Sequence, residues 1–340
     1  MNTAPQPGAG HPLFAQARGL TVLGAGALAA TLLSLAFGSA DIPFSTVLEA
    51  LAGQSQEPAA RVVLELRLPR ALTAFGVGGL LGLSGALLQV LVRNALADPY
   101  IMGTAGGAAA ALLVAVLAGI PVALHAPAAF TGAMLSLALL SLVWRHGGSA
   151  DSQRLVLTGV GLAAGWGALV TFLISVAPPR QIPGLLFWLL GDLGQSQQWH
   201  LAWAVLGLGT AVALLLARPL NLLTLGELPA AALGVETRAL QRIVLGLAAL
   251  LTGVAVSIAG PIGFAGLVAP HLVRLALATD HRILLPGSVL AGGTLVALAD
   301  LLARTLVAPM QLPVGVLTAL LGVPLFLWLL NRSSVVGHGV

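Results

Sequence analysis

The sequence predicts an all-α, polytopic membrane protein that crosses the bilayer with about ten transmembrane helices. Hydrophobic residues make up 58% of the 340 residues and charged residues only 8%, whereas about a quarter of the residues in a soluble domain are charged. The apolar residues form runs long enough to cross a bilayer, not the narrow stripes of a soluble amphipathic helix. Lipid is therefore the solvent that this composition fits.

Apolar runs bounded by charged residues or by Pro/Gly turns define the predicted spans. An even number of spans places both termini on one side of the membrane. If that side is cytoplasmic, most of the 15 arginines lie inside, as the positive-inside rule favours. The spans are expected over residues 20–38, 71–92, 100–120, 124–144, 155–176, 199–217, 241–259, 262–279, 283–303 and 312–330.

The segments outside the spans set the domain boundaries. Residues 1–19 are polar and contain Pro and Gly, so they are expected to form a cytoplasmic tail, and residues 333–340 form a second one. The intervening residues, 20–332, form one transmembrane domain. A signal peptide is the alternative at the N-terminus, with Arg18 before the apolar run and a cleavage site at 38–40.

The second span, 71–92, carries no charge and is rich in glycine. Glycines four residues apart let the backbones of two helices approach closely, so Gly78 and Gly82 are expected to pack against another helix of the protein. Gly161 and Gly165 receive the same interpretation. The second span is therefore expected to lie inside the protein.

Two connections are too polar or too long for tight turns. Residues 177–198 on the outer side hold an apolar run too short to cross the membrane. On the inner side, residues 225–235 start with an acid at Glu227, have Pro229 in the first turn and stop at Gly234, which predicts a short helix. This helix is either a linker or a docking element for a cytoplasmic partner.

Composition also excludes several classes of chemistry. The chain has no cysteine, and every basic residue is arginine, so it lacks the lysine of a Walker A loop. The histidines are dispersed, which gives no metal site, and no cofactor is expected. The arginines are scattered between apolar runs, so they are better explained as residues that set the orientation of the spans in the membrane than as a nucleic-acid binding surface. Asp300 lies one helical turn before Arg304, so these two are expected to pair.

Arginines on the outer side break the positive-inside rule locally. Arg67 and Arg70 precede the second span, and Arg304 lies at the outer end of the ninth. They are either interfacial anchors or donors that recognise the carboxylates of a partner. The acids and His271 give weak support to ion coupling, so a secondary carrier and an intramembrane enzyme are the more distant alternatives.

The order of these motifs resembles the FecCD/BtuC-like permeases of ABC importers over nearly the whole chain. The turn Arg93 to Pro99 is similar to the family's R-N-P-L-A-D-P, with Ala95 in place of the usual Pro. Further family-like stretches are Arg67 to Arg70, Phe187 to Leu193, Leu225 to Val235, Gly260 to His271, Thr279 to Arg282 and Leu312 to Gly315.

The resemblance implies a BtuC-like permease fold in the bacterial inner membrane, with both termini cytoplasmic. It implies a homodimer with a central path, two separate ATPase subunits and a solute-binding protein, importing ferric siderophore or haem, or alternatively cobalamin. The turn residues Arg93, Asn94, Asp98 and Pro99 would be cytoplasmic, and Arg67, Arg70 and Arg304 would meet the binding protein. The ATPase-coupling residues would be Leu225, Gly226, Glu227, Ala230, Ala231, Leu233 and Gly234.

Overall fold

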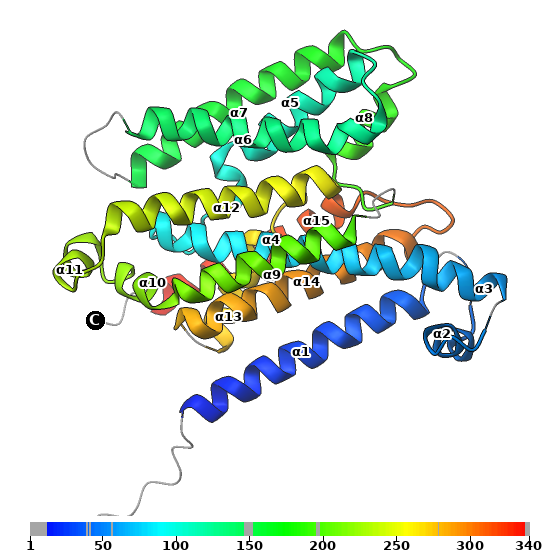
Figure 1. The fold of residues 1–340 in the computed structure, drawn as a ribbon, viewed down its shortest axis with the longest axis horizontal. Coiled ribbons are helices and arrows are strands. Elements are labelled where there is room, and N and C mark those ends of the chain that lie inside the picture. The colour runs from blue at the N-terminus through cyan, green and yellow to red at the C-terminus, as the bar shows by residue number, and fades with distance from the viewer. Residues whose placement is uncertain are drawn as a thin grey trace, which may run out of the picture.

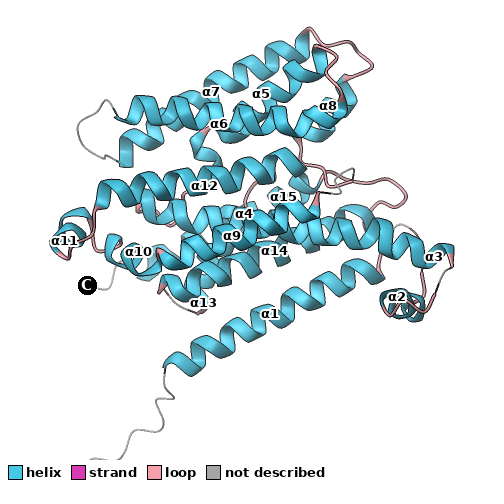
Figure 2. Cartoon of the chain, in the orientation of Figure 1, coloured by secondary structure: helices cyan, strands magenta, loops and turns pink. Residues whose placement is uncertain are grey.

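The computed structural model describes residues 12–38, 40, 42–55, 57–145, 152–194, 198–277 and 279–336. Within these residues the chain forms helices joined by turns and loops, without β-strands (Figure 2). A helix occupies each of the ten predicted spans, so the prediction of an all-α membrane protein is confirmed. These helices are α1 (Pro12–Ala36), α4 (Leu68–Val92), α5 (Thr104–Leu117), α6 (His125–Arg145), α7 (Ser152–Ser175), α9 (Trp199–Leu215), α12 (Thr237–Ala259), α13 (Ala265–Ala276), α14 (His281–Thr305) and α15 (Val314–Val336).

The ten helices differ in length more than the sequence suggests. Six are long and apolar enough to cross a membrane, and α9 together with α10 (Ala217–Leu223) forms a seventh candidate that bends by 59°. Helices α5 and α13 are apolar but shorter, and so is the apolar segment Val314–Leu327 of α15. A 3₁₀-helix, η2 (Pro99–Met102), delays the start of α5, and Phe264 in the left-handed conformation (φ 65°) precedes α13. Local backbone breaks therefore shorten two of the predicted spans.

The predicted tails are partly helical. Helix α1 begins at Pro12, eight residues before the expected start of the first span, and α15 continues to Val336. Residues 1–11 and 337–340, which belong to the two predicted tails, lie outside the described residues.

Helix α4 is the central element of the structure (Figure 1). It contacts α9, α12, α13 and α14, and the apolar window of its span is completely buried inside the protein. Helices α5, α6 and α7 form a separate layer that reaches the centre mainly through α12, while α1 packs on the other side against α14. The expectation that the second span lies inside the protein is confirmed.

Gly78 and Gly82 bring the backbone of α4 into direct contact with α14. A Cβ atom added at Gly78 would lie 2.2 Å from the carbonyl oxygen of Gly292, and one at Gly82 would lie 2.2 Å from that of Ser288. Both carbonyls belong to α14, so the predicted packing face of α4 is confirmed.

The same prediction for α7 is wrong within this chain. Added Cβ atoms at Gly161 and Gly165 would have no neighbour within 4 Å, and only 6% of the apolar window of α7 is buried. Helix α7 contacts its neighbours through residues other than these two glycines. The four-residue spacing therefore indicated a smooth helix face but not what covers that face.

The helices run lengthwise between two ends of the molecule (Figure 1). One end carries α10 and the short helix α11 (Glu227–Ala232), and we call it the α11 end. The opposite end, the α8 end, carries α8 (Ile182–Leu189), α2 (Phe44–Leu51) and α3 (Pro58–Arg61). Helix α8 is the short apolar run that was predicted not to cross the membrane.

Candidate functional site

Helix α11 forms as its local sequence predicts. Its N-cap is Gly226 (φ 113°), Pro229 lies in the first turn, and Gly234 follows the helix with φ 86°. The N–H of Val235 donates to the carbonyl oxygen of Ala230 at 3.0 Å, which closes the helix in the way that a left-handed glycine allows. The local backbone signals therefore predicted this helix correctly.

Three leucines make the surface around α11 apolar. Leu225, Leu228 and Leu233 have 62%, 85% and 61% of their surface exposed. We call these three residues the apolar patch. Ala230, by contrast, is buried and holds the helix against the body. Exposed leucines in one short segment at the end of a membrane bundle are typical of a surface that a partner covers.

Polar contacts connect α11 to the turn that follows α4 and to α12. The side-chain amide of Gln241 donates to Glu227 Oε1 at 3.0 Å, and Arg93 Nη2 lies 3.8 Å from the same oxygen. Arg93 itself is in the left-handed conformation (φ 53°) directly after α4. Glu227 therefore connects α11 both to the residue that follows α4 and to α12.

The rest of the predicted turn folds back toward the core. Asn94 Oδ1 accepts the N–H of Leu96 at 2.9 Å, and Asp98 Oδ1 accepts that of Tyr100 at 2.8 Å. Burial raises the pKa of Asp98 to about 6, against the lowering effect of the backbone N–H groups of Tyr100 and Phe264. Pro99 is buried and packs on Gly266. Ala95, in the place of the family's Pro, leaves the turn intact.

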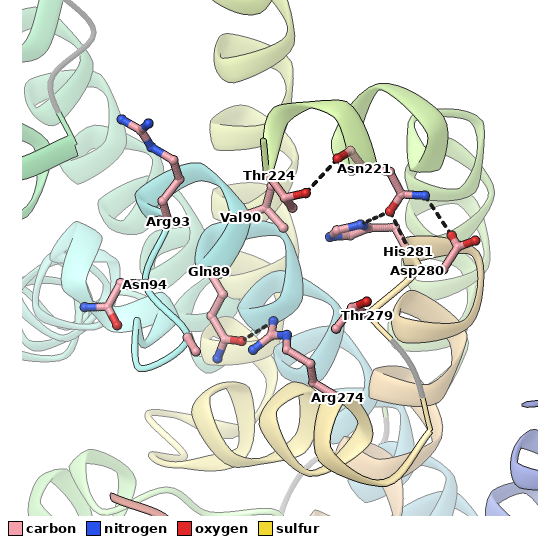
Figure 3. A pocket seen from close by; sticks show the side chains of 11 residues that line it. Gln89, Val90, Arg93, Asn94, Asn221, Thr224, Arg274, Thr279, Asp280 and His281 are labelled. Atoms are coloured by element: carbon pink, nitrogen blue, oxygen red, sulfur yellow. Dashed lines mark hydrogen bonds between the residues drawn. The ribbon is translucent and has the colours of Figure 1, made fainter. Parts of the chain in front are cut away.

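A polar cavity of about 600 Å³ opens beside this turn at the α11 end. Asn221, on α10, organises one wall, because its Nδ2 donates to Asp280 Oδ1 at 2.8 Å and its Oδ1 accepts the N–H of His281 at 3.0 Å (Figure 3). Asp280 caps the N-terminus of α14. The hydrogen bond from the Arg282 N–H is the main cause that lowers the pKa of Asp280, and the hydrogen bond from the Asn221 side chain lowers it further. The cavity is lined by Gln89, Val90, Arg93, Asn94, Ala95, Asn221, Thr224, Arg274, Thr279, Asp280 and His281.

At the α8 end, the predicted docking residue Arg67 is buried. Only 5% of its surface is exposed, and its Nη1 donates to the carbonyl oxygens of Leu35 and Ala36 at 2.8 and 2.9 Å. Its Nη2 donates to the carbonyl oxygen of Ala40. Arg67 therefore supplies donors to carbonyls at and beyond the C-terminal end of α1.

Arg70 and Arg304 share one buried carboxylate. Asp300 is fully buried, and its Oδ1 accepts from Arg70 Nη2 at 2.8 Å while its Oδ2 lies 3.5 Å from Arg304 Nε. The expected pairing of Asp300 with Arg304 is confirmed. Arg304 Nη2 also donates to the carbonyl oxygen of Ser34 at 2.5 Å, and Arg70 Nη1 donates to Gln311 Oε1 at 2.9 Å.

The docking role of these three arginines stays a prediction. Each of the three arginines has an internal bond that contact with a partner would have to break, and Arg70 has in addition an exposed bond to Gln311. For Arg67 and Arg70 the structure thus adds a structural role that the sequence did not suggest, because their acceptors come from distant parts of the chain.

A second cavity, of about 820 Å³, lies at the α8 end. His125, Arg180, Trp188 and Asp192 line it together with apolar residues of α5, α8 and α12. Sequence reasoning missed His125, and it also missed Asn221 and Gln241 at the α11 end. Nothing local distinguishes Asn221 and Gln241, because their partners Asp280 and Glu227 lie 59 and 14 residues away in the sequence.

Comparisons with known proteins agree on one family. The FecCD transport family matches residues 26–332. The chain is 44% identical to the hemin transport system permease protein HmuU of Yersinia pestis over 286 residues, which cover 79% of this chain and 83% of HmuU. It is 39% identical to the vitamin B12 import system permease protein BtuC of Shigella sonnei over 278 residues, covering 80% and 84%. A solved metal-chelate type ABC transporter in an inward-facing conformation aligns with a TM-score of 0.81 at 32% identity, covering 93% of this chain and 99% of that one.

Proposed function

The chain belongs to the FecCD transport family and is the permease subunit of an ABC transporter, and from this membership we propose that it imports a metal chelate, with haem as the first candidate. In this proposal the α11 end faces the bacterial cytoplasm and the α8 end faces outward. The ATP is hydrolysed by separate subunits, since a chain without lysine has no Walker A loop.

The apolar patch is the observation that carries the proposed docking of ATPase subunits. Two ATPase subunits dock on α11 of two permease copies and cover Leu225, Leu228 and Leu233. Gly226 and Gly234 fix the two ends of this coupling helix, and exposed Ala231 leaves room for a close approach. Movement of the ATPase reaches α4 and α12 through Glu227, because this carboxylate binds Gln241 and faces Arg93.

A homodimer accounts for the uncovered face of α7. The open glycines Gly161, Gly165 and Gly167 give this helix a smooth surface, and a second copy of the chain would bury it. The translocation path then lies between the two copies. The small residues of α7 allow a second helix to approach closely, but they offer few groups that could bind a cargo tightly. Weak binding suits a path that must release its cargo.

The cavity at the α8 end supports haem as the cargo. Arg180 offers a charged fork for a propionate, and Trp188 offers a flat apolar face for a macrocycle. Vitamin B12 and ferric siderophores are the alternative chelates. Uptake of each by the reconstituted transporter separates the three, and Arg180→Gln is expected to impair haem uptake more than uptake of an uncharged chelate.

The central test is ATP hydrolysis by the transporter reconstituted with its ATPase subunits and its solute-binding protein. We expect Leu228→Glu to abolish stimulation by the binding protein, because a charge in the apolar patch must be desolvated when the ATPase docks. Leu228→Met, which keeps the apolar surface, should retain most of it. Undiminished stimulation in Leu228→Glu would contradict docking at α11.

A further inference from the structure

The polar cavity at the α11 end contains two buried polar atoms that have no partner among the described residues. These atoms are Nε2 of His281, whose surface is only 1% exposed, and Nη1 of Arg274. Figure 3 shows both side chains reaching toward the middle of the cavity, whereas Arg93 and Asn94 point away from it. Buried polar atoms without partners are rare, so each of them needs an explanation.

The hydrogen bonds around Asn221 determine what His281 can offer. The backbone N–H of His281 donates to Asn221 Oδ1, which identifies that atom as the oxygen. His281 Nδ1 lies 2.5 Å from the same oxygen and must therefore carry a proton. In the neutral ring the proton on Nδ1 leaves Nε2 as a bare acceptor. His281 Nε2 is therefore a hydrogen-bond acceptor in the cavity wall that has no donor among the described residues.

Arg274 offers the opposite chemistry next to it. Its Nη2 donates to Gln89 Oε1 at 2.9 Å, and Gln89 is held in turn by its bond to the carbonyl oxygen of Leu267. No acidic side chain in the described part of the chain forms an ion pair with Arg274. Asp280 also lines the cavity, but its Oδ1 accepts the N–H of Arg282 and the amide of Asn221. The charge of Arg274 is therefore paired only with a neutral amide.

We propose that this cavity binds a small oxyanion that still carries a hydroxyl proton, namely hydrogen phosphate or the monoanion of a phosphate monoester. One phosphate oxygen accepts from Arg274 Nη1, and the P–OH group donates to His281 Nε2. A single group of this kind satisfies both orphaned atoms and compensates the arginine charge. No residue of the apolar patch and no residue of α7 lines this cavity, so variants can alter the site without altering either surface.

The test uses the full chain in phosphatidylcholine nanodiscs, titrated calorimetrically with inorganic phosphate and with sulfate at neutral pH. Sulfate has the same shape but no hydroxyl proton, so it leaves Nε2 unpaired and should bind about tenfold more weakly or worse. Nanodiscs doped with phosphatidic acid distinguish a lipid source of the monoester from free phosphate. Binding of either source supports the site, and binding of neither overturns it.

Two variants locate the binding. Arg274→Gln should abolish phosphate binding, while Arg282→Gln, which removes an exposed charge from the adjacent helix start, should leave it unchanged. His281→Asn keeps a donor near Asn221 Oδ1 but removes Nε2, so the preference for phosphate over sulfate should disappear. If Arg274→Gln fails to fold, His281→Asn still decides. Equal binding of both anions, unaffected by His281→Asn, would identify an adventitious ion only and overturn the proposal.

Discussion

Replacing Gly85 with alanine is expected to prevent stable folding of this permease. A Cβ atom at position 85 would lie 1.7 Å from the carbonyl oxygen of Gly266, a backbone atom that cannot turn aside. Pro270 has no N–H to bond this carbonyl within α13, so the oxygen is free to lean on α4. Helices α4 and α13 would have to separate, which we expect to cost about 3 kcal/mol or more.

Detergent-induced unfolding measured by circular dichroism provides the readout for Gly85→Ala. Gly207→Ala is the matched control, because an added Cβ on α9 meets nothing within 4 Å. That variant should be neutral or up to about 1 kcal/mol more stable, since alanine favours the helix. If both variants unfold at the same detergent fraction, the close contact between α4 and Gly266 does not exist.

Asp300→Asn is expected to destabilise the α8 end strongly. The carboxylate of Asp300 is fully buried between Arg70 and Arg304, and asparagine would leave both guanidinium groups without a counter-charge. Removing one partner of a buried ion pair costs about 3–5 kcal/mol, because the remaining charge stays desolvated. Thermal unfolding of the purified permease measures this loss.

Two further variants show whether charge is the cause. Asp192→Asn removes a carboxylate at the same end that accepts the N–H of Gly194 in an exposed position, so it should change stability by less than about 1 kcal/mol. The double variant Asp300→Asn/Arg304→Met should recover part of the loss, since it removes one stranded charge. Wild-type stability of Asp300→Asn would show that the cluster is not needed for folding.

The internal bonds of the arginines also affect how docking of the binding protein is tested. Charge reversal at Arg67 or Arg304 would damage the fold, so lost stimulation could not be assigned to docking. Arg61 and Arg180 are exposed at the same end and allow charge reversal without breaking buried contacts.

The sequence by itself determined the class of the protein, the ten apolar helical segments, the buried glycine face of α4 and the short helix α11. These features depend on hydropathy, residue spacing and backbone preference, which act over a few neighbouring residues. For the same reason the Asp300–Arg304 pair, one turn apart on a single helix, was predictable.

Only the tertiary structure decided which groups meet across the bundle. It buried Arg67 against carbonyls about 30 residues away and Arg304 against Ser34, 270 residues away. It also left Gly161 and Gly165 uncovered and brought Arg274 and His281 to one cavity. An apolar segment can be buried equally well in lipid or in the interior of the protein. The choice between them, and the partner of each polar group, depends on how distant helices pack.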